Sequence, residues 1–183
     1  MAFPEDPAIS SGLKYHASKI LAHRATLDWA SAQKSSFGIV TLHPSFVFGR
    51  NLLQTSAEGL DGTNAMLWAS LQAPKPPLAM SAVDVKDVAA AHLAALQIPL
   101  KGNGSVEEFL LSARKTEGWS WDQVAEFVKK EYPAVGVTME GPFDEPPSAD
   151  TARAQDVLGM KWRRMEDTMR DFLGQQVELR AKA

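Results

Sequence analysis

A tyrosine and a lysine stand four residues apart in the first part of the chain, at Tyr15 and Lys19. Residues four apart in an α-helix share one face, so a helix here brings the two side chains together. The surrounding apolar residues recur at helical spacing, which predicts a helix over about residues 13–32 with one face for burial. A phenol of pKa about 10 can act as an acid or base near neutral pH when an adjacent ammonium favours the phenolate. The pair is therefore a candidate for proton transfer.

The rest of the chain predicts short strands that alternate with helices. A buried strand is predicted at residues 37–42, after the turn at Ser35 and Ser36, and a short extended piece at residues 83–85. Helices are predicted at residues 63–73, from a cap at Asp84 to about residue 97, and at 165–179. Ser120 followed by Gln123 is a capping-box pattern, and it predicts one more helix that ends before Pro133.

Composition excludes several classes of protein. The chain has 183 residues, a net charge of −3 and no cysteine. It offers no basic field for nucleic acid, no disulfide and no thiolate metal site. No apolar run approaches the roughly 20 residues that span a bilayer, so we expect no membrane insertion and a cytoplasmic location. His16 and His23 are two helical turns apart with no carboxylate at ligand spacing, and we expect no metal site.

Four blocks in a fixed order carry a resemblance to a known family. With the Tyr15-to-Lys19 segment, they resemble the extended short-chain dehydrogenases/reductases of the NAD-dependent epimerase/dehydratase superfamily. Within that superfamily they are most similar to the dihydroflavonol and cinnamoyl-CoA reductase branch of carbonyl reductases. The blocks are residues 39–50 (IVTLHPSFVFGR), 83–93 (VDVKDVAAAHL), 108–113 (EFLLSA) and 154–160 (AQDVLGM).

The resemblance implies roles for the first site residues. It makes Tyr15 the proton donor to a substrate carbonyl, and it makes Lys19 the residue that holds the nicotinamide ribose and lowers the pKa of the tyrosine. Lys19 and Pro44 would contact the cofactor, NADP(H) by resemblance, if a nucleotide-binding half is supplied. His43 stands where the family often has Asn, and at a strand end it is a candidate general base. A partly buried His that bonds a backbone carbonyl is the alternative for this position.

The segment after Pro44 resembles the family's substrate loop. The resemblance makes Phe46, Val47, Phe48 and Arg50 candidate substrate-binding residues. Arg50 replaces the Pro that usually follows this glycine, a departure from the family pattern that could offer a cation to a carboxylate or an enolate.

A phosphate cradle is missing from the sequence. Dinucleotide binding in this architecture needs a Gly-rich turn between a strand and a helix N-terminus. The chain has no G-x-G-x-x-G, and its nearest glycine pairs, Gly59 with Gly62 and Gly102 with Gly104, lack the flanking strand and helix. We expect no cofactor on the isolated chain, because the resemblance places the cradle in an N-terminal half that this chain lacks.

The predicted fold is α/β: a truncated doubly wound, Rossmann-like parallel sheet with a small α/β substrate lobe. Residues 1–183 are expected to form a single domain. Residues 1–60 and 82–116 are assigned to the sheet remnant, and residues 61–81 and 117–183 to the substrate lobe and C-terminal helices. A two-strand remnant leaves a sheet edge and helix faces uncovered, so we expect a homo-oligomer or a partner chain.

Three functions are compatible with the sequence, and whether the chain is an enzyme stays open at this stage. The first is a carbonyl reductase that needs its missing half from elsewhere. The second is a cofactor-independent isomerase, cyclase or lyase that uses Tyr15 and Lys19 for proton transfer. The third is a non-catalytic binding or scaffold protein. The expected ligand is a small organic molecule, in the first case a carbonyl compound.

Overall fold

The computed structural model describes residues 10–145 and 149–182. Its residues form two compact units: residues 1–41 with 99–108, the first unit, and residues 42–98 with 109–183, the second unit. The predicted single domain therefore comprises two compact units. The finer division into sheet remnant and substrate lobe stays a prediction, and its residues 1–9, 146–148 and 183 lie outside the described part.

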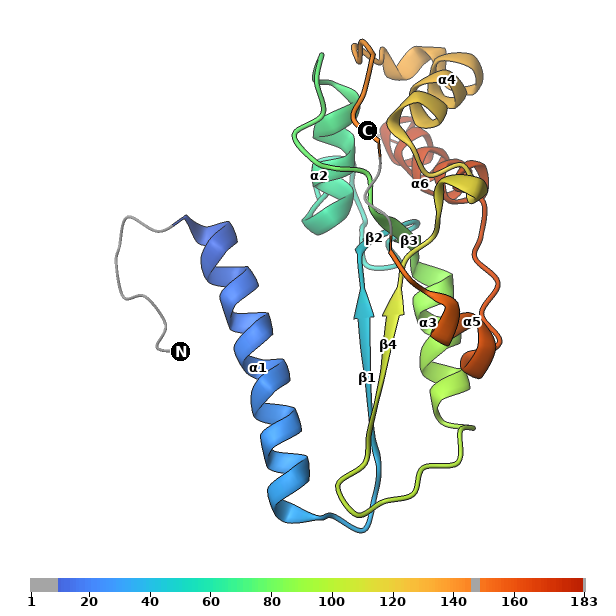
Figure 1. Cartoon of the computed structure of the whole chain (residues 1–183). Coiled ribbons are helices and arrows are strands. Elements are labelled where there is room, and N and C mark those ends of the chain that lie inside the picture. Colours follow the sequence, from blue (N-terminus) through green and yellow to red (C-terminus); the bar gives the residue numbers. More distant parts are fainter. Residues whose placement is uncertain (1–9, 146–148, 183) are drawn as a thin grey trace. The chain divides into compact units, whose positions relative to one another are not determined.

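The long helix α1 (Ser11–Gln33) dominates the first unit (Figure 1). It begins because the Ser10 side chain accepts a hydrogen bond from the backbone N–H of Leu13 at 3.3 Å. It ends at Lys34, whose φ of 46° is left-handed and whose N–H bonds the Ala30 carbonyl at 3.2 Å. Of the predicted apolar stripe, Ala30 is buried, whereas Leu13 and Ile20 are exposed. Ala17, Leu21 and Leu27 are half-buried, so full burial is reached only at the C-terminal end of the helix.

A close backbone contact closes the first unit next to that buried end. Gly104 has a φ of +78°, and a Cβ on it would lie 2.4 Å from the Ala30 carbonyl oxygen, so no larger residue fits without movement. The Trp29 and Phe37 rings stack with centroids 6.0 Å apart. The loop before the second strand of this unit is therefore packed against the last turn of α1.

Two short sheets replace the single remnant that the sequence predicts. Strand β1 (Ile39–Pro44) pairs with β4 (Val106–Leu111), and both arrows point the same way in Figure 1. In the second unit, β2 (Phe46–Phe48) pairs in parallel with β3 (Ala82–Asp84), with Phe46 opposite Ala82 and Phe48 opposite Asp84. The strand β2 was not predicted, because three residues directly after Pro44 are too few to show an alternating pattern.

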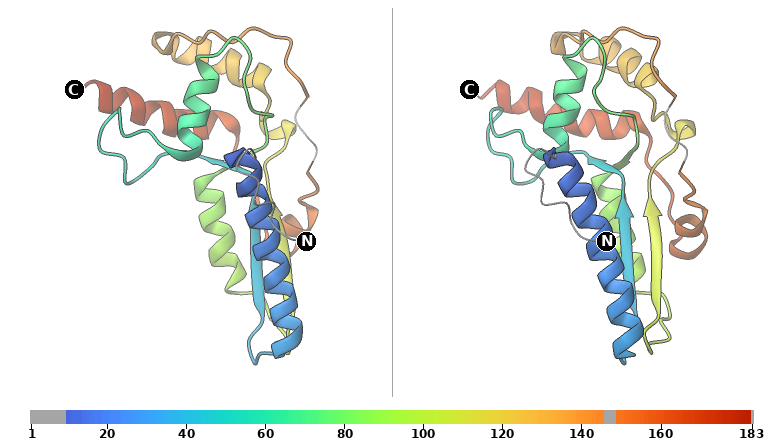
Figure 2. Two further views of the ribbon diagram at one scale, coloured as in Figure 1. Left: turned by 90° about the vertical axis from the view of Figure 1, so that its left-hand side faces the viewer. Right: turned by 60° about the vertical axis from the view of Figure 1, so that its left-hand side comes forward.

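The helices of the second unit confirm the predicted positions to within a few residues. Figure 2 shows α6 running past α2 and α4, with which it forms the core of this unit. The elements are α2 (Gly62–Leu71), α3 (Val85–Ala95), α4 (Trp121–Glu131), α5 (Ala152–Leu158), α6 (Met165–Arg180) and two 3₁₀ turns, η1 (Lys115–Glu117) and η2 (Pro133–Val135). None of the described helices combines the length and apolar character that crossing a bilayer would need.

Capping explains where α3 and α4 begin. The Asp84 carboxylate accepts the backbone N–H of Lys86 at 2.6 Å, as predicted. Ser120 accepts the N–H of Gln123 at 3.3 Å, which confirms the forward half of the capping box. The Gln123 side chain accepts from the Ser120 hydroxyl at 3.0 Å, so its predicted bond to the Ser120 backbone is replaced by a bond between side chains.

Candidate functional site

The predicted proton-transfer pair lies on the exposed surface of α1. The Lys19 ammonium is 5.4 Å from the centroid of the Tyr15 ring, and the Tyr15 side chain is 58% exposed. The His16 ring meets the Tyr15 ring edge-on at 5.8 Å. The helix thus brings tyrosine and lysine together as their spacing predicts. With the phenol open to solvent, a carbonyl compound can reach it.

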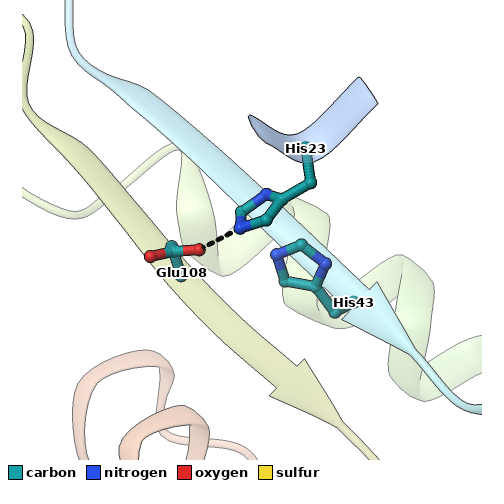
Figure 3. A group of neighbouring side chains, drawn as sticks. All are labelled: His23, His43 and Glu108. Carbon is teal, nitrogen blue, oxygen red and sulfur yellow. Dashed lines mark ion pairs between the residues drawn. The ribbon is translucent and has the colours of Figure 1, made fainter. Parts of the chain in front are cut away.

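A second polar pair lies further along α1. His23 Nε2 is 2.7 Å from an oxygen of Glu108 on β4, and both residues belong to the first unit (Figure 3). The sequence did not reveal this pair, because 85 positions of chain separate its members and no local motif links them. His43, also labelled in Figure 3, lies next to the end of β1 in the second unit and is partly buried.

The predicted substrate-binding residues divide between the two faces of β2. The Phe46 and Phe48 rings stack nearly parallel, with centroids 6.2 Å apart and an angle of 3°. Successive strand residues point to opposite faces, so Val47 faces the other way. Phe48 is buried against Trp119, at 6.2 Å between centroids, while Phe46 is half-buried. Phe46 is therefore the member of this aromatic pair that a ligand can touch.

The other face of β2 opens into a hollow of about 540 Å³ within the second unit. Val47, Phe48 and Arg50 belong to its wall together with the turn that follows them, so three of the predicted residues meet here and Phe46 does not. Its walls are mainly apolar. The hollow is lined by Val47, Phe48, Gly49, Arg50, Asn51, Leu52, Leu53, Asp61, Gly62, Thr63, Asn64, Val85, Lys86 and Ala89.

Helix α2 fixes the first part of the turn that borders this hollow. The Asn64 side chain accepts from the Gly49 N–H at 3.3 Å and donates to the Gly49 carbonyl at 2.7 Å. The Thr63 hydroxyl donates to the Val47 carbonyl at 2.5 Å. A Cβ at Gly49 would lie 2.8 Å from a methyl of Val85, so this position accepts only glycine without movement. The backbone from Val47 to Gly49 is thus held from two sides.

Helix α6 fixes the second part of the turn. Gln175 exchanges two hydrogen bonds with the backbone of Asn51, at 2.9 and 2.6 Å. The side chains of Gln54 and Gln176 exchange two more, at 3.1 and 3.0 Å, and both are buried. These glutamines were not predicted, because amides on a C-terminal helix carry no signal of their partner 120 residues earlier. Residues 50–54, which we call the anchored turn, are therefore rigidly placed.

Arg50 is engaged rather than open. Its guanidinium forms two hydrogen bonds with Glu178 on α6, at 3.3 and 2.6 Å. The hydrogen bond to Glu178 raises the pKa of Arg50, and the same bond lowers the pKa of Glu178. The predicted use of Arg50 as a cation for a carboxylate or enolate would require a ligand to displace Glu178.

A buried acidic cluster joins α3 to the C-terminal segment. Asp84 is 1% exposed and accepts a hydrogen bond from the Thr168 hydroxyl at 2.6 Å. Asp87 accepts the backbone N–H of Arg163 at 2.8 Å, and the Arg163 side chain lies 3.3 Å from the same carboxylate. Burial raises the pKa of Asp87, and the nearby charge of Asp84 raises it further. Asp84 and Asp87, both in the block at residues 83–93 that resembles the family, thus hold α3 against the C-terminal segment.

Known proteins resemble this chain over one half of their length. No protein-family model matches it. Ketoreductase sphI of Aspergillus fumigatus is 37% identical over 169 residues, which cover 90% of this chain and 49% of that protein. Ketoreductase CTB6 of Cercospora beticola is 31% identical over 190 residues, which cover 97% of this chain and 52% of that protein. The chain therefore spans about half the length of the curated relatives it matches.

Solved structures show the same fold. The structure of yeast methylglyoxal/isovaleraldehyde reductase Gre2 complexed with NADPH matches with a TM-score of 0.70 at 19% identity, over all of this chain and 56% of that chain. The fold is thus α/β and Rossmann-like, as predicted. More particularly, the chain is homologous to the ketoreductases and corresponds to the C-terminal half of such a protein.

Proposed function

We propose that this chain is the substrate-side half of an NADP(H)-dependent ketoreductase, which becomes active with a nucleotide-binding half. The observation that carries the proposal is the Tyr15 and Lys19 pair, with the ammonium 5.4 Å from the ring centroid, in a homologue of ketoreductases. The two residues lie on an exposed helix face, where a phenol can meet a substrate.

In this proposal Tyr15 is the acid. Its hydroxyl donates a proton to the carbonyl oxygen of the substrate, and the Lys19 ammonium favours the phenolate that remains. NADPH, when bound by the complete reductase, would supply the hydride that reduces the carbonyl carbon. Lys19 and Pro44 are the residues of this chain proposed to lie beside it. His43 is proposed as a second proton-transfer group at the end of β1.

Phe46 is the proposed substrate contact. It is half-buried and stacks on Phe48, so it presents an apolar ring edge to a ligand while Phe48 supports it from behind. Val47 and Arg50 face the hollow on the other side of β2, and for them we propose a supporting role in the anchored turn. Phe46→Ala should then raise KM more than Val47→Ala does.

We propose further that the chain alone binds NADP(H) without useful affinity. The positive end of a helix dipole attracts a pyrophosphate only if that end carries no negative charge. Acidic side chains stand at the N-cap or in the first turn of the longer helices of the second unit, namely Asp61 at α2, Asp84 at α3, Asp122 at α4 and Glu166 at α6. The N-termini of these four helices therefore do not suit a pyrophosphate, and the sequence has no Gly-rich turn.

The surface proposed for the nucleotide-binding half is the exposed apolar side of α1. Leu13 and Ile20, two helical turns apart, are exposed there, although each is a residue that folded proteins usually cover. A second copy of the chain is the alternative cover for this helix. Either would meet the expectation, made from the sequence, of a homo-oligomer or a partner chain.

The experiment combines this chain with the first half of ketoreductase sphI. NADPH oxidation is followed by absorbance with a panel of aromatic and aliphatic ketones, and NADPH binding is measured by calorimetry for the chain alone and for the mixture. We expect binding and turnover only in the mixture. Tyr15→Phe should reduce kcat on the order of a hundredfold or more, while Tyr132→Phe, the matched control, should leave it unchanged. Wild-type turnover by Tyr15→Phe would refute the role of the phenol.

The two other functions give different results in the same assays. A cofactor-independent isomerase, cyclase or lyase would convert its substrate without NADPH and would still depend on Tyr15. A binding or scaffold protein would be indifferent to Tyr15→Phe. Micromolar NADPH binding by the isolated chain would instead contradict the proposed need for a second half.

A further inference from the structure

The anchored turn presents two consecutive leucines to solvent. Leu52 and Leu53 are each 89% exposed, more than any other large apolar residue among those described. Single exposed leucines are ordinary, but an adjacent pair beside an apolar hollow forms a patch. The hollow of about 540 Å³ lies next to the pair, and both leucines contribute to its wall.

The turn is held in this position by side-chain hydrogen bonds on both sides of its apolar tip. Asn51 and Gln54, which flank the leucines, are each bonded to α6 by a glutamine that exchanges two hydrogen bonds. The Asn51 side chain also accepts the Leu53 N–H at 2.9 Å. A turn fixed on both sides of its apolar tip has little entropy left to lose on binding, which favours docking of the tip into a partner.

The polar groups of the hollow are already satisfied within the chain. Thr63 bonds the Val47 carbonyl, and Asn64 makes two bonds with Gly49. The hollow therefore suits an apolar object rather than a polar ligand that would need to be oriented by hydrogen bonds.

The charges at the rim point to a second copy of this chain. Arg50 pairs with Glu178 at 2.6 Å, and Lys86 pairs with Asp171. All four side chains are partly exposed, so the cations Arg50 and Lys86 in the wall of the hollow each bring an anion beside it. A second copy brings the same four charges, and a two-fold axis can place cations opposite anions without a like-charged field.

We propose that two copies dock through this patch, each inserting Leu52 and Leu53 into the hollow of the other. A protruding pair and a hollow that lie side by side on one face are self-complementary, which is the requirement of a two-fold interface. This interface lies entirely in the second unit and does not depend on the proposed reductase activity. Two leucines a side make a small interface, and interfaces below about 1,200 Å² are mostly weak or transient, so we expect a dimer that dissociates on dilution.

Sedimentation velocity over a concentration series tests the proposal on the purified chain. We expect a monomer–dimer equilibrium that weakens at least tenfold in the double variant Leu52→Ser, Leu53→Ser. Leu96→Ser is the matched control, because Leu96 is 79% exposed and lies outside the hollow. A monomer at every concentration overturns the proposal. A dimer equally strong in the double variant also overturns it and moves the interface elsewhere, for example to α1.

A second set of variants blocks the hollow instead of the leucines. Ala89 lines it and is exposed on α3, whereas Ala90 is exposed on the same helix but does not line it. Ala89→Arg should abolish the dimer, and Ala90→Arg should not. The chain has no cysteine, so a mixture of Leu53→Cys and Ala89→Cys chains should form a mixed disulfide under mild oxidation, while Leu53→Cys with Ala90→Cys should not. Equal cross-linking in the two mixtures would refute the docking geometry.

Discussion

Thr168→Val removes one hydrogen bond from a buried charge and leaves the volume of the side chain unchanged. The Thr168 hydroxyl donates to the Asp84 carboxylate at 2.6 Å, and both residues are almost fully buried. A hydrogen bond to a charged group contributes about 1.5–3 kcal/mol, and the carboxylate keeps its bond from the Lys86 N–H. We therefore expect the variant to lose about 2 kcal/mol in its free energy of unfolding. For a chain of this size that loss corresponds to about 4–8 °C in Tm.

Two other Thr→Val variants calibrate this loss. Thr63 donates to a neutral carbonyl at Val47, so Thr63→Val should cost about 1 kcal/mol. Thr26 donates to the carbonyl of Ala22 in its own helix, and its loss should stay within about 0.5 kcal/mol. Urea denaturation followed by tryptophan fluorescence measures all three. If Thr168→Val costs no more than Thr26→Val, the buried carboxylate does not depend on this hydroxyl and the reasoning is wrong.

Two further variants test other parts of the structure. Gly104→Ala should destabilise the first unit, because its Cβ would lie 2.4 Å from the Ala30 carbonyl oxygen. Gly136→Ala is the control, because Gly136 has a similar φ of +67° with open space around it. Equal losses of Tm in the two variants would show that backbone strain, not this contact, causes the loss. Because burial raises the pKa of Asp87, the folded state holds that proton more tightly, and the stability from this carboxyl falls as pH rises from the unfolded pKa of about 4. The unfolding free energy of the wild type should therefore fall relative to that of Asp87→Asn between pH of about 4 and about 7. A difference that stays constant over this range would contradict the raised pKa.

Local patterns were sufficient for most elements of the fold. The caps at Ser120 and Asp84 fixed the starts of α4 and α3, because a side chain that bonds an N–H two or three residues ahead is a short-range interaction. The spacing of Tyr15 and Lys19 placed them together for the same reason. The strand β2 escaped prediction, since its partner β3 lies more than 30 residues later and three residues show no period of their own.

The candidate site also depends on contacts between residues that lie far apart in the sequence, which local patterns do not predict. Phe46, Val47 and Arg50 were predicted as one substrate-binding group, but the alternation of strand side chains separates Phe46 from the hollow that Val47 lines. Arg50 was predicted as a cation that a ligand could use, and the structure pairs it with Glu178, 128 residues later. A sequence gives the charge of a residue but not the neighbour that satisfies it.

By itself, the sequence determined the fold class, the family resemblance and the Tyr15–Lys19 pair, since these depend on local hydrogen bonds, helical spacing and motif order. Tertiary structure alone decided that Gln175 and Gln176 anchor the turn after Gly49, that Leu52 and Leu53 are left at its tip, and that a hollow opens beside them. Each of these features depends on contacts between segments more than 100 residues apart or on the space left between them. Such contacts are set by how the elements pack, and no local pattern in the chain records them.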